Sequence, residues 1–211
     1  MSLADVLINT GYLLLVINTI LYFISCRKKS MAYEALFIFL ILTLAVQIPM
    51  AILAGFGDDN LFLSHYYFIG QFILMSLFFY KTLINKVVKK IIFMVLFGVM
   101  LALLVQYFKN PELYYTFNLF EISITSIPII FYCFSFMVQQ ISNPEKKFIY
   151  FISGLFAYTI CSTLIFLAGN IPGDTQIILW TVNNSLYILF QLLIFLEWYR
   201  NFREKRLINL T

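Results

Sequence analysis

Long apolar runs separated by short polar breaks are the dominant pattern of this chain. A helix needs about 20 mostly apolar residues to cross the hydrocarbon core of a bilayer. Seven runs meet this requirement, at residues 6–26, 34–55, 61–83, 89–108, 115–138, 148–169 and 176–199. Most of the breaks combine charged residues with Gly, Pro or Asn, which end helices and form turns. The pattern predicts an all-α, polytopic integral membrane protein, with residues 1–211 forming a single transmembrane domain of seven helices.

The composition indicates a bilayer rather than water as the solvent of these helices. Apolar residues make up 62% of the 211 positions and charged residues only 11%. Soluble proteins have about 45–50% apolar and about 25% charged residues, and a chain this apolar would expose large apolar patches in water. The lipid bilayer is therefore the first predicted partner. The first ten residues contain Asp5 but no Lys or Arg, so we expect no cleaved signal peptide here.

Basic residues fall almost entirely on one side of the predicted membrane. If the seven helices alternate in direction, thirteen of the fourteen Lys and Arg residues share one side, and only Lys109 lies opposite. The thirteen are Arg27, Lys28, Lys29, Lys81, Lys86, Lys89, Lys90, Lys146, Lys147, Arg200, Arg203, Lys205 and Arg206. Acidic loop residues gather opposite, namely Asp5, Asp58, Asp59, Glu112 and Asp174. Because Lys and Arg resist translocation, the N-terminus is predicted outside and the C-terminus in the cytoplasm.

The charge distribution and the composition also bear on partners and location. The net charge of +4 and the basic segment at 200–206 are better explained by a cytoplasmic rim that contacts anionic lipid heads than by binding of nucleic acid. Frequent Phe, Ile, Asn and Lys residues are typical of an AT-rich bacterial genome. The predicted location is therefore the plasma (inner) membrane of a bacterium.

Two stretches of the chain share a sequence rhythm. AILAGFGDDN…FIGQFILMSLFFYKTL (51–83) and LIFLAGNIPGD…SLYILFQLLIFLEWYRNF (164–202) each contain an Ala-Gly helix exit, a short acidic turn, an intramembrane Gln and an aromatic-Tyr-basic ending. The helix at 89–108 is almost featureless apart from Gln106, as expected for a lipid-facing linker. The rhythm predicts a 3+1+3 repeat of the kind found in membrane transporters.

This 3+1+3 plan with an outside N-terminus resembles the broad class that contains SWEET and PQ-loop transporters, rhodopsins and bacterial seven-helix sensor modules. The resemblance covers the whole chain and is architectural. Pro49 and Pro128 lie within predicted spans, as hinge prolines do in such transporters. The order Gln47-Ile48-Pro49 differs from the Pro-Gln pair of the PQ-loop family, however, so the transporter pattern is matched only in part.

Several membrane-protein chemistries lack their residues in this sequence. The last span (176–199) has no Lys for a retinal Schiff base, and His65 is the only histidine, too few for a zinc site of the ceramidase kind. There is no GxSxG motif for a serine nucleophile. Cys26, Cys133 and Cys161 lie in apolar runs without a CxxC pair, which favours packing roles over disulfides or metal ligation. We therefore expect no cofactor, no metal and no recognisable catalytic motif.

Polar residues inside the spans are the candidates for function, because they are costly at membrane depth. A stripe at helical spacing runs along the fifth span, and a second runs along the seventh: Glu121, Thr125, Pro128, Tyr132 and Ser135, then Trp180, Asn184, Tyr187 and Gln191. Most such residues are predicted in the outer half of the membrane, which favours an outward-facing polar cavity. Its predicted ligand-binding residues are Gln47, His65, Tyr66, Tyr67, Gln71, Glu121, Trp180, Asn183 and Asn184.

The alternative interpretation of these residues is structural, with polar groups that only bond neighbouring helices. In the cavity hypothesis, Glu121 and His65 are the two ionisable side chains that give the cavity its charge. At the opposite membrane face, Glu34 and Glu197 are predicted to form solvated ion pairs near Arg200 and the loop lysines.

Three functions follow from this pattern. The favoured one is a receptor or sensor that binds a small ligand from outside and signals through a cytoplasmic partner such as a histidine kinase. The alternatives are a small-solute or ion transporter of the 3+1+3 type and an intramembrane lipid-modifying enzyme that uses Glu121 and His65 as acid and base. A polar lining confined to the outer half favours the receptor over the transporter. The sequence is also compatible with a homo-oligomer.

Overall fold

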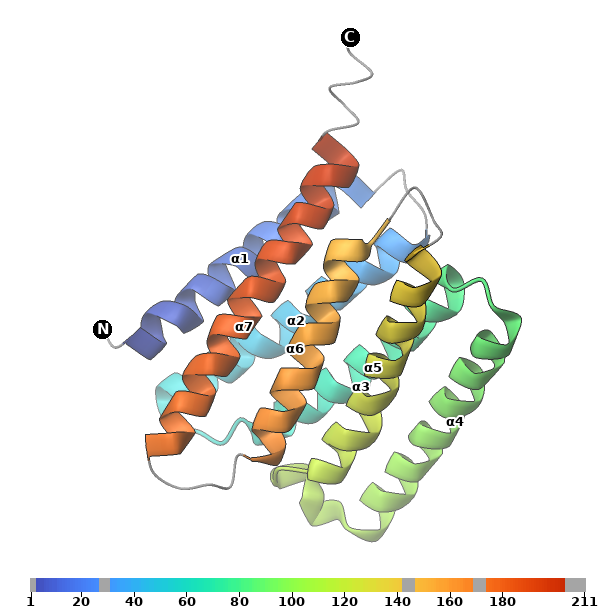
Figure 1. Cartoon of the computed structure of the whole chain (residues 1–211). Coiled ribbons are helices and arrows are strands. Elements are labelled where there is room, and N and C mark those ends of the chain that lie inside the picture. Colours follow the sequence, from blue (N-terminus) through green and yellow to red (C-terminus); the bar gives the residue numbers. More distant parts are fainter. Residues whose placement is uncertain (1–2, 27–30, 142–146, 169–173, 204–211) are drawn as a thin grey trace. The chain divides into compact units, whose positions relative to one another are not determined.

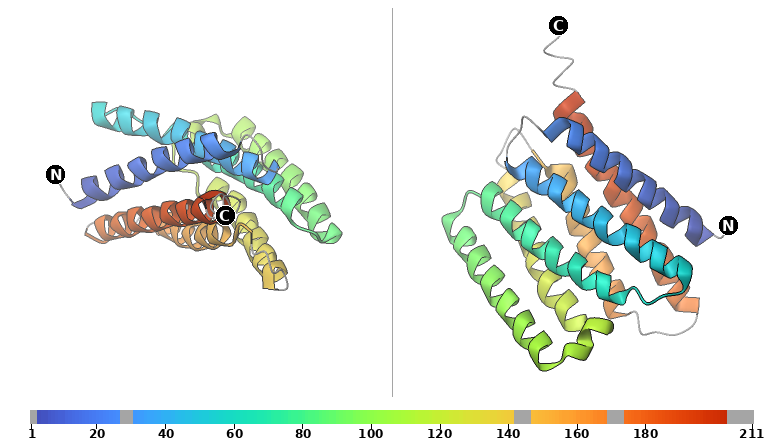
Figure 2. Two further views of the ribbon diagram at one scale, coloured as in Figure 1. Left: turned by 90° about the horizontal axis from the view of Figure 1, so that it is seen from above. Right: turned by 180° about the vertical axis from the view of Figure 1, so that it is seen from behind.

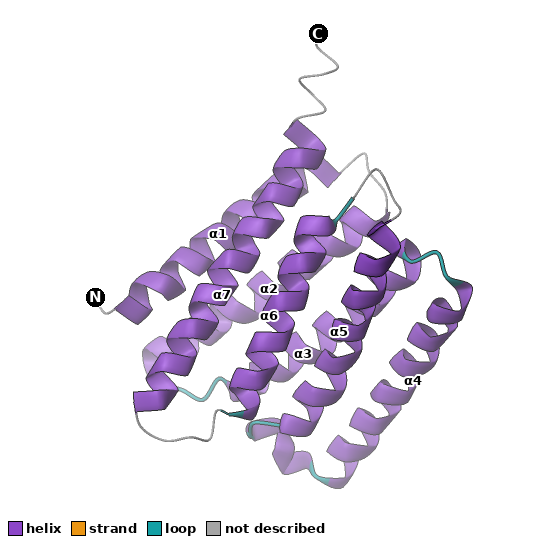
Figure 3. Ribbon diagram, viewed as in Figure 1, coloured by secondary structure: helices purple, strands orange, loops and turns teal. Residues whose placement is uncertain are grey.

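The computed structural model describes residues 3–26, 31–141, 147–168 and 174–203, and this part of the chain is helical without strands (Figures 1 and 3). The helices are α1 (Leu3–Cys26), α2 (Met31–Phe56), α3 (Leu61–Thr82), α4 (Lys86–Lys109), η1 (Pro111–Tyr115), α5 (Leu119–Ile141), α6 (Ile149–Leu167), α7 (Asp174–Trp198) and η2 (Tyr199–Arg203). Seven of them are long and apolar enough to cross a membrane. The sequence prediction of an all-α chain with seven helices that have the length and apolar composition of membrane spans is thus confirmed.

The largest difference from the predicted bounds is at the start of α5. The apolar run predicted a helix from residue 115, but Pro111–Tyr115 forms a separate 3-10 turn and α5 begins at Leu119. Thr116 is extended between them, and the Asn118 side-chain oxygen accepts a hydrogen bond from the Glu121 backbone N–H at 3.1 Å. A side-chain acceptor three residues ahead is a helix-capping contact, so Asn118 fixes where α5 starts.

The helices form two compact units, which divide α5 between them. Unit 1 comprises residues 1–29 and 133–211, and unit 2 comprises residues 30–132. This grouping joins α1 to α6 and α7, and it therefore does not follow the predicted division into helices 1–3 and 5–7. The basic residues at 27–29, 146, 205 and 206, on which the predicted orientation partly depends, lie outside the described residues.

In unit 1, α1 and α7 lie side by side and run in the same direction (Figures 1 and 2). Asn18 donates hydrogen bonds to the backbone and side-chain oxygens of Gln191, at 2.8 and 2.9 Å. Seven residues further along each helix, the Trp198 indole N–H donates to Ser25 Oγ at 2.9 Å. The two contacts come in the same order along both helices, so α1 and α7 are parallel.

The packing of α6 against α7 depends on a glycine. A Cβ atom at Gly154 would lie 2.9 Å from the Phe190 ring and 3.0 Å from a Leu193 methyl group. Small residues permit this kind of close approach between membrane helices. Phe151 and Tyr158 stack on the same Phe190 ring, with centroids 6.0 and 5.5 Å away.

Glu197 closes the other end of this helix pair. Its carboxylate accepts hydrogen bonds from the backbone N–H of Phe148 at 2.7 Å and of Tyr150 at 3.1 Å, and from the Asn201 amide at 2.5 Å. The side chain is fully buried. The predicted solvated ion pair at Glu197 is therefore wrong: the carboxylate satisfies the free N–H groups at the start of α6, a favourable position for a negative charge.

In unit 2, α2 and α3 form a hairpin and α4 packs along α3 (Figure 2). The α3 residues Phe72, Met75, Phe78 and Phe79 are fully buried. In contrast, Ile92 and Leu103 are the only buried residues of α4. The exposure of α4 agrees with the lipid-facing character predicted for it, although Tyr107 in its last turn is bonded to α5.

Candidate functional site

The ends of three helices meet in unit 2 at a buried acid, a histidine and a tyrosine. Glu121 lies in the first turn of α5 and is fully buried, and His65 in the second turn of α3 is 4% exposed. Tyr107 lies two residues before the end of α4. At a rise of about 1.5 Å per residue, all three side chains start within roughly 6 Å of a helix end. The cluster therefore lies near the level of the helix termini.

The three side chains are bonded to one another. His65 Nδ1 is 3.0 Å from Glu121 Oε1 and 2.9 Å from the Tyr107 hydroxyl, and that hydroxyl donates to Glu121 Oε2. The sequence predicted Glu121 and His65 as separate ionisable side chains of a cavity, whereas the structure places them in direct contact. Both carboxylate oxygens of Glu121 are engaged, at the end of a helix whose dipole favours negative charge.

This geometry fixes the protons of the cluster when Glu121 is ionised. Tyr107 has one hydroxyl proton, which it donates to Glu121, so its oxygen can only accept from His65. Both partners of His65 Nδ1 are then acceptors, and Nδ1 must carry the proton. The other ring nitrogen, Nε2, is buried and has no hydrogen-bond partner among the described residues. A buried nitrogen of this kind calls for an explanation.

Hydrogen bonds from two amide side chains position the residues of the cluster. Asn118 and Gln106 exchange side-chain hydrogen bonds of 3.1 and 3.3 Å, and the Asn118 amide also reaches the Tyr107 hydroxyl at 3.3 Å. Because Asn118 Oδ1 also caps α5 at Glu121, one residue links the start of α5 to the end of α4. This link orients the acid and the tyrosine together.

A pair of tyrosines extends from the cluster to the surface. The Tyr114 ring of η1 stacks on the His65 ring with centroids 5.8 Å apart, and its hydroxyl lies 2.6 Å from that of Tyr66, which is half exposed. The hydrogen bond with Tyr66 raises the pKa of Tyr114 to about 12. Tyr114 therefore stays neutral at neutral pH, and η1 places a neutral aromatic ring against the imidazole.

The remaining predicted site residues are spread over both units. In unit 2, Gln71 is buried and Gln47 and Tyr67 are half-buried. The other three belong to α7 in unit 1: Asn183 is buried, Asn184 is half-buried and Trp180 is 44% exposed. The buried line of α7 passes through Asn183, Tyr187 and Gln191, and Trp180 lies off this line.

Buried polar residues are found toward both ends of the helices. Buried polar side chains occur near the C-terminal ends of α3, α5 and α7 as well, at Ser76, Gln140 and Glu197. Glu197 joins this set because it is buried rather than solvated as predicted. The cluster at His65 is therefore distinguished by the direct bonding of an acid, a histidine and a tyrosine rather than by its end of the helices.

The cluster residues that sequence reasoning missed are Tyr107, Asn118 and Tyr114. Tyr107 and Asn118 lie at helix ends, where an aromatic or amide residue is ordinary. An antiparallel pairing of α3 with α4 brings residue 107 level with residue 65, and this pairing was the signal available.

The comparisons with protein-family models, curated proteins and solved structures find no match for this chain.

The assigned tautomer gives a direct test, because His65 is the only histidine. In protein labelled with ¹⁵N,¹³C-histidine, we expect the ring nitrogen shifts at neutral pH to show a proton on Nδ1. We expect Tyr107→Phe to retain this state, because Glu121 still accepts from Nδ1. A neutral ring protonated only on Nε2 would contradict the geometry.

Proposed function

We propose that the protein is a seven-helix membrane receptor that binds a small cationic or hydrogen-bond-donating ligand at the His65–Glu121–Tyr107 cluster. The observation that carries this proposal is the unpartnered, buried Nε2 of His65 beside a buried carboxylate. A cluster that only joined helices would gain by completing its hydrogen bonds, since an unsatisfied buried group costs about 1–3 kcal/mol. A ligand that donates to Nε2 would recover this cost.

The orientation supports a signal that passes from outside to inside. We place the N-terminus and the His65 cluster outside and the C-terminus in the cytoplasm, on the charge asymmetry of the sequence. The parallel course of α1 and α7 in unit 1 supports an odd number of crossings between them, as the five helices α2 to α6 would provide. The readout in this proposal is a cytoplasmic partner such as a histidine kinase. The internal duplication stays a proposal from sequence rhythm alone.

A second candidate is a transporter for a small solute or ion, and polar groups in unit 1 favour it. Buried polar residues on α7 extend from Asn183 through Gln191 to Glu197, about 21 Å at 1.5 Å per residue. The side-chain oxygens of Asn183 and Asn18 have no hydrogen-bond partner within the described parts of the chain. A transported solute needs such groups along much of the membrane thickness.

Two measurements on purified protein separate these functions. A panel of small ammonium and polyhydroxy compounds is screened for a rise in melting temperature, and each hit is tested for a shift of the single His65 resonance. The receptor proposal expects a hit that perturbs His65 and is not taken up by proteoliposomes. Uptake above empty vesicles would favour the transporter, whereas stabilising hits that leave His65 unchanged would count against the cluster as the site.

A further inference from the structure

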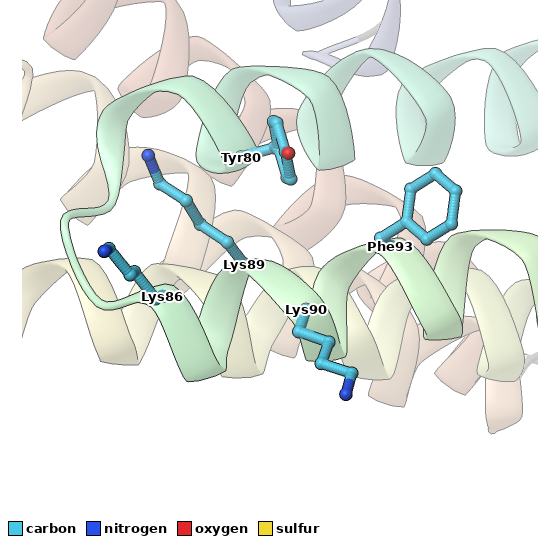
Figure 4. A pocket seen from close by; sticks show the side chains of 5 residues that line it. All are labelled: Tyr80, Lys86, Lys89, Lys90 and Phe93. Atoms are coloured by element: carbon cyan, nitrogen blue, oxygen red, sulfur yellow. The ribbon is translucent and has the colours of Figure 1, made fainter.

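The turn between α3 and α4 carries a basic hollow that the proposed ligand site does not use. Its volume is about 340 Å³, and it is lined by Tyr80, Lys86, Lys89, Lys90 and Phe93 (Figure 4). This volume is in the range of small-molecule sites. The hollow lies where two membrane spans end, since α3 ends at Thr82 and α4 begins at Lys86. It is therefore at the level of lipid head groups.

The three lysines bring uncompensated positive charge to this place. No residue in the described ranges forms an ion pair with them. Lys89 lies with its Nζ 5.7 Å from the centre of the Tyr80 ring, and Figure 4 shows it reaching from α4 toward α3. Lys86 and Lys89 are one helical turn apart, whereas Lys90 points away from Tyr80 in this view. Lys86 and Lys89 are thus the main candidates to hold an anion.

Their position on the helix increases the attraction for an anion. The N-terminus of a helix carries partial positive charge, so lysines are unfavourable there and an anion is favourable. The Asn85 side chain already accepts from the backbone N–H groups of Val87 and Val88, at 2.8 and 3.3 Å. The cap is therefore complete, and the lysine side chains rather than backbone N–H groups remain to bind.

The surroundings of the hollow suit a lipid rather than a free anion. Phe93 is 64% exposed, and Val87 and Ile84 beside the turn are 67% and 74% exposed. In a membrane these apolar side chains contact acyl chains and glycerol backbones. A lipid phosphate at Lys86 and Lys89 would thus have apolar surface directly beneath it, as basic pockets between membrane helices offer to anionic head groups.

We propose that this hollow binds the phosphate head group of an anionic phospholipid. Lys86 and Lys89 contact the phosphate, Tyr80 holds Lys89 in place, and Phe93 packs against the upper part of the lipid. The site is independent of the His65 cluster. It gives lipid composition a direct influence on the α3–α4 pair.

The test uses the full chain in an uncharged detergent with added phosphatidylglycerol, phosphatidylcholine or glycerol phosphate. We expect phosphatidylglycerol to raise the melting temperature by several degrees and the other two to have little effect. The double variant Lys86→Gln/Lys89→Gln should lose at least half of this shift. Lys109→Gln removes one charge at the other end of α4 and should keep the full phosphatidylglycerol shift. It is the matched control for the single variant Lys89→Gln.

Three outcomes would overturn the proposal. Equal shifts with phosphatidylcholine would mean that only apolar contact stabilises the protein. An equal shift with glycerol phosphate would make this a site for soluble anions rather than for lipid. An unchanged phosphatidylglycerol shift in the double variant, with its melting temperature in detergent alone still like wild type, would exclude these lysines. If the double variant is unstable, the phosphatidylglycerol shifts of Lys89→Gln and Lys109→Gln are compared instead. Equal shifts in these two variants would overturn the proposal.

Discussion

Replacement of Glu197 by Ala is expected to destabilise the protein by about 3 kcal/mol or more, because each buried donor left without an acceptor costs about 1–3 kcal/mol. The Phe148 and Tyr150 N–H groups lose their acceptor. The Asn201 amide loses the side-chain acceptor and keeps only the Glu197 backbone oxygen. For a chain of this size the loss corresponds to roughly 6–12 °C in melting temperature. Thermal unfolding in a mild detergent measures it.

Glu34→Ala is the matched control for this prediction. Glu34 is exposed near the start of α2, and its removal should change stability by less than about 0.5 kcal/mol. Glu197→Gln should fall between the two, because an amide keeps one acceptor oxygen. Equal melting temperatures for Glu197→Ala and Glu34→Ala would refute the capping role and return Glu197 to the solvated rim that the sequence suggested.

The seven helices could be predicted because their signal is local. Twenty apolar residues in a row identify a span whatever the neighbouring helices do. The buried face of α5 was predicted for the same reason, since Glu121, Thr125 and Tyr132 follow helical spacing and all are buried. The candidate site needed long-range information, because Glu121 and His65 are separated by 56 positions and only the fold brings them into contact.

The errors share one physical origin, which is that the same residue type serves several roles at a helix end. Glu197 near Arg200 has the sequence pattern of a surface ion pair, but it caps a helix that begins 48 residues earlier in the chain. Trp180 has both the spacing of the polar stripe on α7 and the position of an interfacial tryptophan, and its exposure agrees with the second. Helix pairing decides these cases, and it is not encoded in the period of one segment.

Replacement of Glu121 by Gln is expected to remove the response to any ligand that acts through the His65 cluster while the fold is retained. The amide has nearly the shape of the carboxylate but only one acceptor oxygen. Two donors, from His65 Nδ1 and the Tyr107 hydroxyl, now converge on Glu121, so one of them must turn away. We expect a stability loss of about 1–2 kcal/mol.

The variant is also expected to weaken ligand binding. Glu121 accepts from His65 Nδ1 and so keeps Nε2 as the acceptor for the ligand. Loss of a hydrogen bond that contributes about 0.5–1.5 kcal/mol should weaken binding to Glu121→Gln by up to about tenfold. Asp58→Asn, the same change at an exposed residue before α3, should bind like wild type. The measurement is the melting-temperature shift with a hit from the ammonium and polyhydroxy panel. If Glu121→Gln is destabilised but keeps the full ligand shift, the cluster joins helices and the ligand binds elsewhere, because a ligand bonded to Nε2 would bind more weakly once the carboxylate no longer fixes the proton on Nδ1.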